Sequence, residues 1–106
     1  MNLKIAENSF RFRITPKELD ALLNGQEIDQ RVCLGSHCFA YRVSPFALGQ
    51  DIELEMAVGG FCLYVPRRDL EDLRDLGRSK GGISSRQGGV ELALQVDIKE
   101  QMKRAA

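Results

Sequence analysis

Cys33 and Cys38 form the most specific pair of reactive side chains in the sequence. They flank a Gly35-Ser36 segment, and a two-residue turn there would place them directly opposite each other in a hairpin, near disulfide range. His37 is adjacent in sequence, but strand alternation places it on the opposite face. One hypothesis is therefore a thiol redox or metal site at Cys33 and Cys38. The sequence favours a simpler interpretation, a reduced and solvent-accessible pair with no bound metal.

Glu53 and Glu55 place two carboxylates on one face of a predicted strand, a spacing that can hold a divalent cation. The Glu53-Leu54-Glu55 segment resembles the first part of the Glu-x-Glu-x-Lys signature of the triphosphate tunnel superfamily. Ala57 stands at the lysine position of that signature. The resemblance implies a barrel of eight strands built from two similar halves, and metal-dependent phosphate chemistry at Glu53 and Glu55.

Five basic side chains form a candidate anion site. Lys4, Arg11 and Arg13 fall on the polar face of one predicted hairpin, and Arg31 and Arg42 would join them if the next hairpin lay beside it. Guanidinium groups bind phosphate through two parallel hydrogen bonds, so such a cluster would suit an anion or a nucleotide phosphate. Acidic residues on the same polar faces favour the alternative, a solvated surface of mixed charge.

Length and composition limit the classes of function. The chain has 106 residues, of which 43% are hydrophobic and 28% charged, as expected for one globular domain spanning residues 1–106. Lys and Arg total 15 and Asp and Glu total 15, so no net field would attract nucleic acid or an anionic membrane. The sequence contains no signal-like or membrane-spanning apolar run and no cofactor motif. These features predict a cytoplasmic protein with no cofactor.

Alternation of apolar and polar residues predicts four β-hairpins. A turn at Asn8-Ser9 would pair Ile5 with Phe12 and set Lys4 opposite Arg13 on the other face. Three further turns are predicted by glycine-containing dipeptides: Gly35-Ser36, Gly59-Gly60 and Gly88-Gly89. The second of the four hairpins should align Val32 with Phe39, Cys33 with Cys38, Asp29 with Arg42 and Ile28 with Val43.

One short helix is predicted between the first and second hairpins, and another between the third and fourth. Thr15 is a predicted N-cap, Pro16 takes the first helical position and Glu18 completes a capping box, while Gly25 ends the helix. Pro66 opens the second helix. Each helix has a stripe of leucines, at Leu19, Leu22 and Leu23 in the first and Leu70, Leu73 and Leu76 in the second.

The order of elements predicts an α+β fold with an antiparallel sheet of about eight strands. Residues 10–25 and 61–77 share a strand, a proline, a leucine stripe and a closing glycine, which is consistent with two ββαββ halves. Eight strands present more apolar surface than two short helices cover, so the sheet should curl into a barrel-like form or bury the remainder in a homodimer. Residues 99–106 should form a short helix or a frayed tail. The predicted core contains Phe12, Phe39, Leu54, Leu63, Leu92 and Leu94, with Arg13, Glu55 and Glu91 outside it.

Residues 3–15, with Lys4-Ile5, Asn8-Ser9, Arg11-Phe12-Arg13 and Thr15, resemble the opening of a family of small uncharacterised bacterial proteins. The strand ending at residues 63–66 and the strand at residues 92–99 are similar to later segments of that family. The resemblance implies a bacterial origin and carries no activity or ligand. The preferred function is therefore a non-enzymatic binding or assembly module, acting with a second copy or another protein. The alternatives are a phosphate binder and a thiol site.

Overall fold

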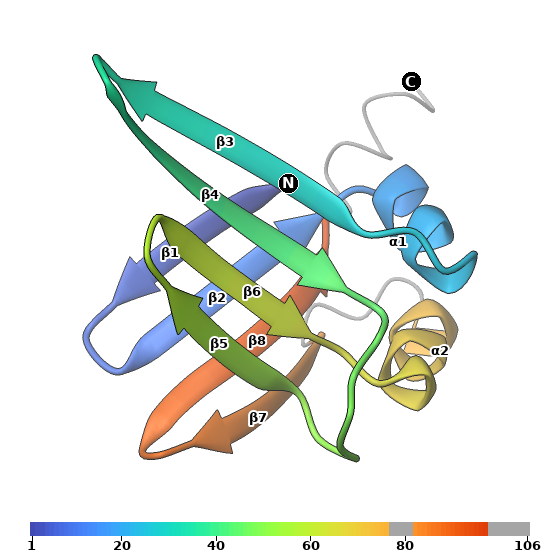
Figure 1. Cartoon of the computed structure of the whole chain (residues 1–106). Helices are drawn as coiled ribbons and strands as arrows, with labels where there is room; N and C mark the ends of the chain where they lie inside the picture. The colour runs from blue at the N-terminus through green and yellow to red at the C-terminus, as the bar shows by residue number, and fades with distance from the viewer. Residues whose placement is uncertain (77–81, 98–106) are drawn as a thin grey trace.

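A computed structural model describes residues 1–76 and 82–97 (Figure 1). The predicted tail at residues 99–106 and the predicted closing glycine, Gly77, lie outside the described residues. The elements in chain order are β1 (Asn2–Ala6), β2 (Ser9–Ile14), α1 (Pro16–Leu23), β3 (Ile28–Leu34), β4 (His37–Ser44), β5 (Glu53–Ala57), β6 (Gly60–Tyr64), α2 (Arg67–Leu76), β7 (Ile83–Gln87) and β8 (Val90–Val96).

The strands form two four-stranded sheets, ordered β1-β2-β8-β7 and β3-β4-β6-β5. Each sheet joins two antiparallel hairpins through a central parallel pair, β2 with β8 and β4 with β6. The α+β class is confirmed, but the predicted single antiparallel sheet is wrong: both sheets are mixed, and they do not close into a barrel. The reason is the course of the chain, because each helix carries it from one sheet to the other, so the first hairpin meets the fourth in one sheet and the second meets the third in the other (Figure 1).

The two ββαββ halves repeat one another at a spacing of 51 residues. Phe12 pairs with Leu94 across the parallel strands of one sheet, and Leu63 pairs with Val43 in the other. Leu63 lies 51 positions after Phe12, and Leu94 lies 51 positions after Val43. Exchanging the halves therefore maps one sheet onto the other, which is the pattern of a pseudo-twofold axis.

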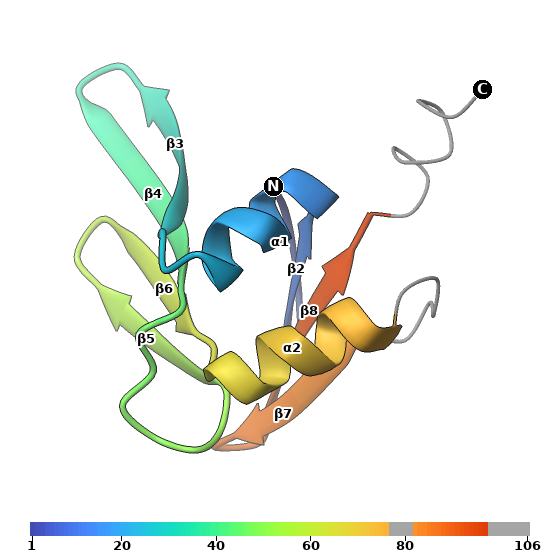
Figure 2. The same cartoon turned by 90° about the vertical axis from the view of Figure 1, so that its right-hand side faces the viewer.

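The helices lie between the sheets along one side of the molecule, where they pack against each other (Figure 2). The predicted capping box at the start of α1 is confirmed: the Glu18 N–H donates to Thr15 Oγ1 at 3.1 Å, and the Thr15 N–H donates to Glu18 Oε1 at 2.9 Å. Arg67, the first residue of α2, donates from Nη1 to the Leu23 carbonyl at 2.9 Å. This contact fixes the start of one helix to the end of the other.

The core fills the space between the two sheets and the helices. Four of the six predicted core residues are fully buried, and Leu54 packs against the core while partly exposed. Phe39 is also only partly buried, because it lies at the end of the sheets away from the helices. Arg13 and Glu55 are exposed as expected, and Glu91 is half-buried. The buried apolar residues are Phe12, Ile14, Leu19, Leu22, Val43, Ile52, Leu63, Val65, Leu70, Leu73, Leu92 and Leu94.

The first and third hairpins turn one residue earlier than predicted. Asn8 and Gly59 take the left-handed conformation in these turns, with φ of 60° and 87°, so the turns are residues 7–8 and 58–59. Lys4 therefore faces Arg11 and not Arg13. The shift moves the register by two residues, which keeps every side chain on its predicted face. The second and fourth hairpins have the predicted turns.

Candidate binding surfaces

The end of the molecule away from the helices is open and apolar. We call it the open end and define it by Ile5, Phe10, Phe39, Met56 and Phe61. The Phe61 ring contacts those of Phe10 and Phe39, each with centroids 5.2 Å apart and in an edge-to-face arrangement. Ile5 lies opposite Phe10 and Met56 opposite Phe61, and their side chains are 53% and 67% exposed.

The pseudo-twofold repeat explains why these residues gather. Phe61 lies 51 positions after Phe10, and Met56 lies 51 positions after Ile5, so the open end is built from the same two positions of each half. The helices follow the far ends of β2 and β6, which leaves this end without helical cover (Figures 1 and 2). A contiguous exposed apolar surface of this kind is typical of an interaction site.

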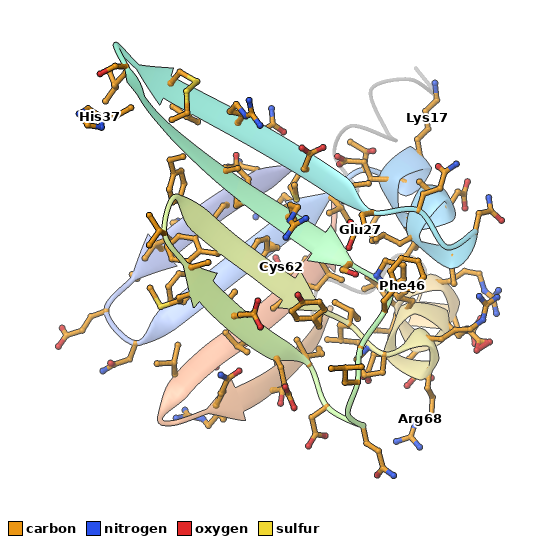
Figure 3. All side chains as sticks on the ribbon, in the orientation of Figure 1. Lys17, Glu27, His37, Phe46, Cys62 and Arg68 are labelled. Atoms are coloured by element: carbon orange, nitrogen blue, oxygen red, sulfur yellow. A yellow bond between two sulfur atoms is a disulfide. The ribbon has the colours of Figure 1, made fainter. Side chains whose placement is uncertain are left out.

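The β3–β4 hairpin extends beyond the rest of its sheet and ends in an exposed tip (Figures 1 and 3). The predicted opposition of Cys33 and Cys38 is confirmed, with their Cα atoms 4.0 Å apart. The structure joins the two sulfurs in a disulfide, whereas the sequence favoured free thiols. Val32 and Leu34 in the same tip are 51% and 80% exposed. The tip therefore combines a disulfide with uncovered apolar side chains.

Cys62, the third cysteine, lies on β6 and is buried. Burial raises the pKa of the Cys62 thiol, and its hydrogen bond with Tyr64 raises the pKa of the Tyr64 hydroxyl. Both groups therefore stay protonated at neutral pH. Cys62 is a buried structural thiol and takes no part in the Cys33–Cys38 pair (Figure 3).

The five basic residues of the predicted anion site are not brought together. Lys4, Arg11 and Arg13 lie on β1 and β2 of one sheet, whereas Arg31 and Arg42 lie on β3 and β4 of the other. The prediction required the first two hairpins to be neighbours, and α1 separates them by carrying the chain to the second sheet. The structure therefore places the five residues on two different sheets.

Arg31 and Arg42 still share a hollow of about 290 Å³ on the outer face of their sheet. Small residues of β4, β5 and β6 line its middle, and Asp29 and Glu55 contribute negative charge to it. Arg42 Nη1 lies 3.9 Å from Glu27 Oε1, in a solvent-exposed ion pair. The hollow has mixed charge, as the alternative interpretation of the polar faces predicts.

Glu53 and Glu55 line a separate cleft of about 330 Å³. The loop between β4 and β5 forms its other wall and contributes Asp51 together with the exposed apolar residues Phe46 and Leu48 (Figure 3). Within residues 1–76 and 82–97, no three His, Cys, Asp or Glu side chains are grouped as a metal site would require. The loop between β4 and β5 has no regular periodicity, so sequence reasoning missed this cleft.

Gln87 joins the edges of the two sheets, a contact that sequence reasoning also missed. Its side-chain Oε1 accepts from the Leu54 N–H at 2.8 Å, and its Nε2 donates to the Leu54 carbonyl at 3.1 Å. The amide thus occupies backbone groups of β5 that would otherwise face solvent. Gln87 is an exposed polar residue beside a turn, and its sequence carries no signal of a partner 33 positions away.

Comparison with known proteins gives a family but no activity. A family of unknown function, DUF7009, matches residues 1–101. No curated protein and no solved structure matches the chain at a significant level. No helix in the described part of the chain is long and apolar enough to cross a membrane. The match covers nearly the whole sequence and confirms the predicted membership of an uncharacterised family; the chain therefore belongs to DUF7009, a family of unknown function.

Proposed function

We propose that this protein is a non-enzymatic assembly module that docks onto another protein through its open end. The observation that carries the proposal is the continuous apolar surface formed there by Ile5, Phe10, Phe39, Met56 and Phe61. The Phe61 ring packs edge-to-face against the rings of Phe10 and Phe39, so the three aromatic side chains are already arranged before a partner arrives. Preformed aromatic anchors lower the entropic cost of association and often dominate binding energy.

The placement of the polar groups supports docking over catalysis. The predicted basic cluster is divided between two sheets. Glu53 lines only the cleft beside the loop between β4 and β5, whereas Arg31 and Arg42 line only the neighbouring hollow, and Glu55 borders both. Metal-dependent phosphate chemistry needs a cation and anion-binding groups around one substrate. The apolar open end, in contrast, draws on both halves of the chain.

The test is a pair of charge insertions at the open end. A protein carrying both Ile5→Glu and Met56→Glu should fold, because both side chains are mostly exposed, but should lose saturable binding to partners from an extract of the source cells. Leu48→Glu is the control, since Leu48 is fully exposed in the loop between β4 and β5. Binding that survives the double substitution, or binding that Leu48→Glu removes equally, would contradict the proposal.

A second candidate function is anion binding in the Arg31–Arg42 hollow. The observation in its favour is that both guanidinium side chains line the same hollow. Inorganic phosphate should then raise the unfolding temperature of the wild type, and Arg42→Ala should abolish that rise. Arg13→Ala, on the other sheet, should leave it intact. An equal phosphate-induced rise in the unfolding temperatures of Arg42→Ala and Arg13→Ala would exclude this site.

A further inference from the structure

Strand β3 is the most exposed and longest edge strand among the described residues. The edges of the two sheets are β1 and β7 in one and β3 and β5 in the other. β3 has seven residues, against five in each of the other three, and every residue from Asp29 to Leu34 is exposed. The β5 edge is occupied at Leu54 by the Gln87 amide. β3 therefore offers the longest row of backbone groups for pairing.

The hairpin register shows which backbone groups face outward. The residues that flank a two-residue turn, here Leu34 and His37, form a hydrogen-bonded pair, and the two kinds of pair alternate along an antiparallel ladder. The N–H and C=O groups of Asp29, Arg31 and Cys33 consequently point away from β4. A further strand must pair with these residues.

We propose that β3 pairs antiparallel with β3 of a second copy of this chain, about a twofold axis at Gln30. In this register Asp29 lies opposite Arg31 of the second copy, and Arg31 opposite its Asp29, so the outward backbone groups meet and both charge pairs are attractive. On the other face Ile28 lies opposite Val32 of the second copy. Gln30 meets the second copy's Gln30, which can exchange side-chain amide hydrogen bonds.

The charges select this register. Moving the axis to residue 29 would oppose two Asp29 carboxylates, and moving it to residue 31 would oppose two Arg31 guanidinium groups. No other edge strand can form a pair of opposite charges with the same strand of a second copy, because each carries charge of one sign only. The charged residues are Lys4 in β1, Glu53 and Glu55 in β5, and Arg86 in β7. In the part of the chain that the structure describes, β3 alone has both signs of charge on a sheet edge.

Asp29 and Arg31 are available for this pairing. The ion pairs formed within 4 Å by residues 1–76 and 82–97 include neither of them. The same register brings Leu34 at the tip of one hairpin beside the start of β3 and the end of α1 in the other copy. The exposed apolar side chains of the tip would thereby be covered, and two four-stranded sheets would become one sheet continuous across the dimer.

This inference goes beyond the proposed function, because it uses the β3 edge and leaves the open end free. If the protein did not dimerise through β3, the proposed docking at the open end would still stand. If docking at the open end failed, the proposed dimer would still stand. A dimer with two open ends would present two docking surfaces to a partner.

Charge reversal tests the proposed register. The wild type should have the mass of a dimer by light scattering at about 100 µM, well above a micromolar Kd. Asp29→Arg and Arg31→Asp should each be monomeric, because like charges then face each other across the axis. An equimolar mixture of the two variants should recover the dimer mass, since the arginine at position 29 of the first variant then meets the aspartate at position 31 of the second, and Arg31 of the first meets Asp29 of the second. Lys4→Asp changes the net charge as much as Arg31→Asp and should remain dimeric.

A cysteine cross-link gives a second measurement that does not depend on those variants folding. Gln30→Cys places two thiols opposite each other on the axis, so mild oxidation should produce a covalent dimer. Gln26→Cys should not, because that position faces Leu34 of the second copy. A monomeric wild type, a dimer that both charge reversals leave intact, a mixture that stays monomeric, or equal cross-linking at residues 26 and 30 would each overturn the proposal.

Discussion

The two halves of the chain end in equivalent hairpins, β3–β4 and β7–β8, which the molecule uses differently. In β8, Leu92 and Leu94 are buried in the core, and Gln87 at the end of β7 bonds the opposite sheet. In β3, only Ile28 packs against the core, and the strand then runs into a tip closed by a disulfide. The same ββαββ unit thus gives one hairpin that completes the fold and one that projects from it.

The difference shows where contact surfaces arise in a duplicated architecture. A repeated unit must satisfy the same core contacts twice, so residues near the pseudo-twofold axis are constrained in both halves. Residues beyond the reach of the opposite sheet are free of that constraint. The extended β3–β4 hairpin contains the exposed edge and the disulfide, and each is a departure from the repeat.

Replacing one leucine by alanine in the β7–β8 hairpin and one in the β3–β4 hairpin should give the largest difference in stability. Leu94→Ala should lower the free energy of unfolding by about 2–5 kcal/mol, because it leaves a cavity in the core. Leu34→Ala should change it by less than about 0.5 kcal/mol in dilute protein, since Leu34 is mostly exposed. Denaturant titration measures both. Similar losses would show that the two hairpins contribute equally to the fold.

The two parallel strand pairs, β2–β8 and β4–β6, should differ in how well they tolerate an alanine side chain at equivalent positions. A Cβ atom on Gly60 would run into the carbonyl oxygen of Ala40, so Gly60→Ala should force β4 and β6 apart. We expect a loss of about 1–3 kcal/mol or more in unfolding free energy. Ser9 holds the equivalent place in β2, and Ser9→Ala should be nearly neutral. A neutral Gly60→Ala would contradict the close approach of these strands.

Reduction of the tip disulfide should have a smaller effect. The bond closes a short loop in a hairpin whose register is already set by β4, so its loss should lower stability by at most about 2 kcal/mol. Thermal unfolding with and without a dithiol reductant measures the loss. Alkylation of the reduced protein should label Cys33 and Cys38 quickly and Cys62 slowly, because burial raises the pKa of Cys62. Loss of the whole fold on reduction would refute a peripheral disulfide.

Removal of the Gln87 amide should have the smallest effect. Gln87→Ala deletes two exposed hydrogen bonds to the Leu54 backbone, worth together about 1 kcal/mol. The Leu54 N–H should then exchange faster with solvent, as that of an unprotected edge strand does. Gln50→Ala, in the exposed loop between β4 and β5, is the control. Unchanged exchange at Leu54 would mean that Gln87 does not protect the β5 edge.

Local structure could be predicted from the sequence because its causes are local. The capping box of α1 needs only Thr15 and Glu18, and the register of β3 and β4 follows from the Gly35-Ser36 turn. The turns at Asn8 and Gly59 were misplaced by one residue because Asn and Gly can both adopt positive φ, and the sequence does not show which turn position they occupy.

Long-range arrangement could not be predicted, because alternation does not say which hairpins become neighbours. The parallel pair β2–β8 follows from the two helices, which take the chain to the second sheet and back, whereas β4 and β6 are connected through a loop and β5. The first of these crossings divided the basic residues Arg11 and Arg42 between two sheets. The open end was missed for the same reason. Phe10 and Phe61 have core-like patterns in their own hairpins, and only the pseudo-twofold arrangement brings them together at an uncovered end.

Residue-resolved hydrogen exchange at two protein concentrations tests most directly the claim that one hairpin completes the fold and the other makes contacts. The amides of Leu92 and Leu94 should be protected equally in dilute and concentrated protein, because their protection comes from the fold. The outward-facing amides of Asp29 and Arg31 should exchange fast when the protein is dilute and slowly when it is concentrated. Exchange at Asp29 and Arg31 that does not depend on concentration, or protection as strong as that of Leu94 in dilute protein, would contradict the account.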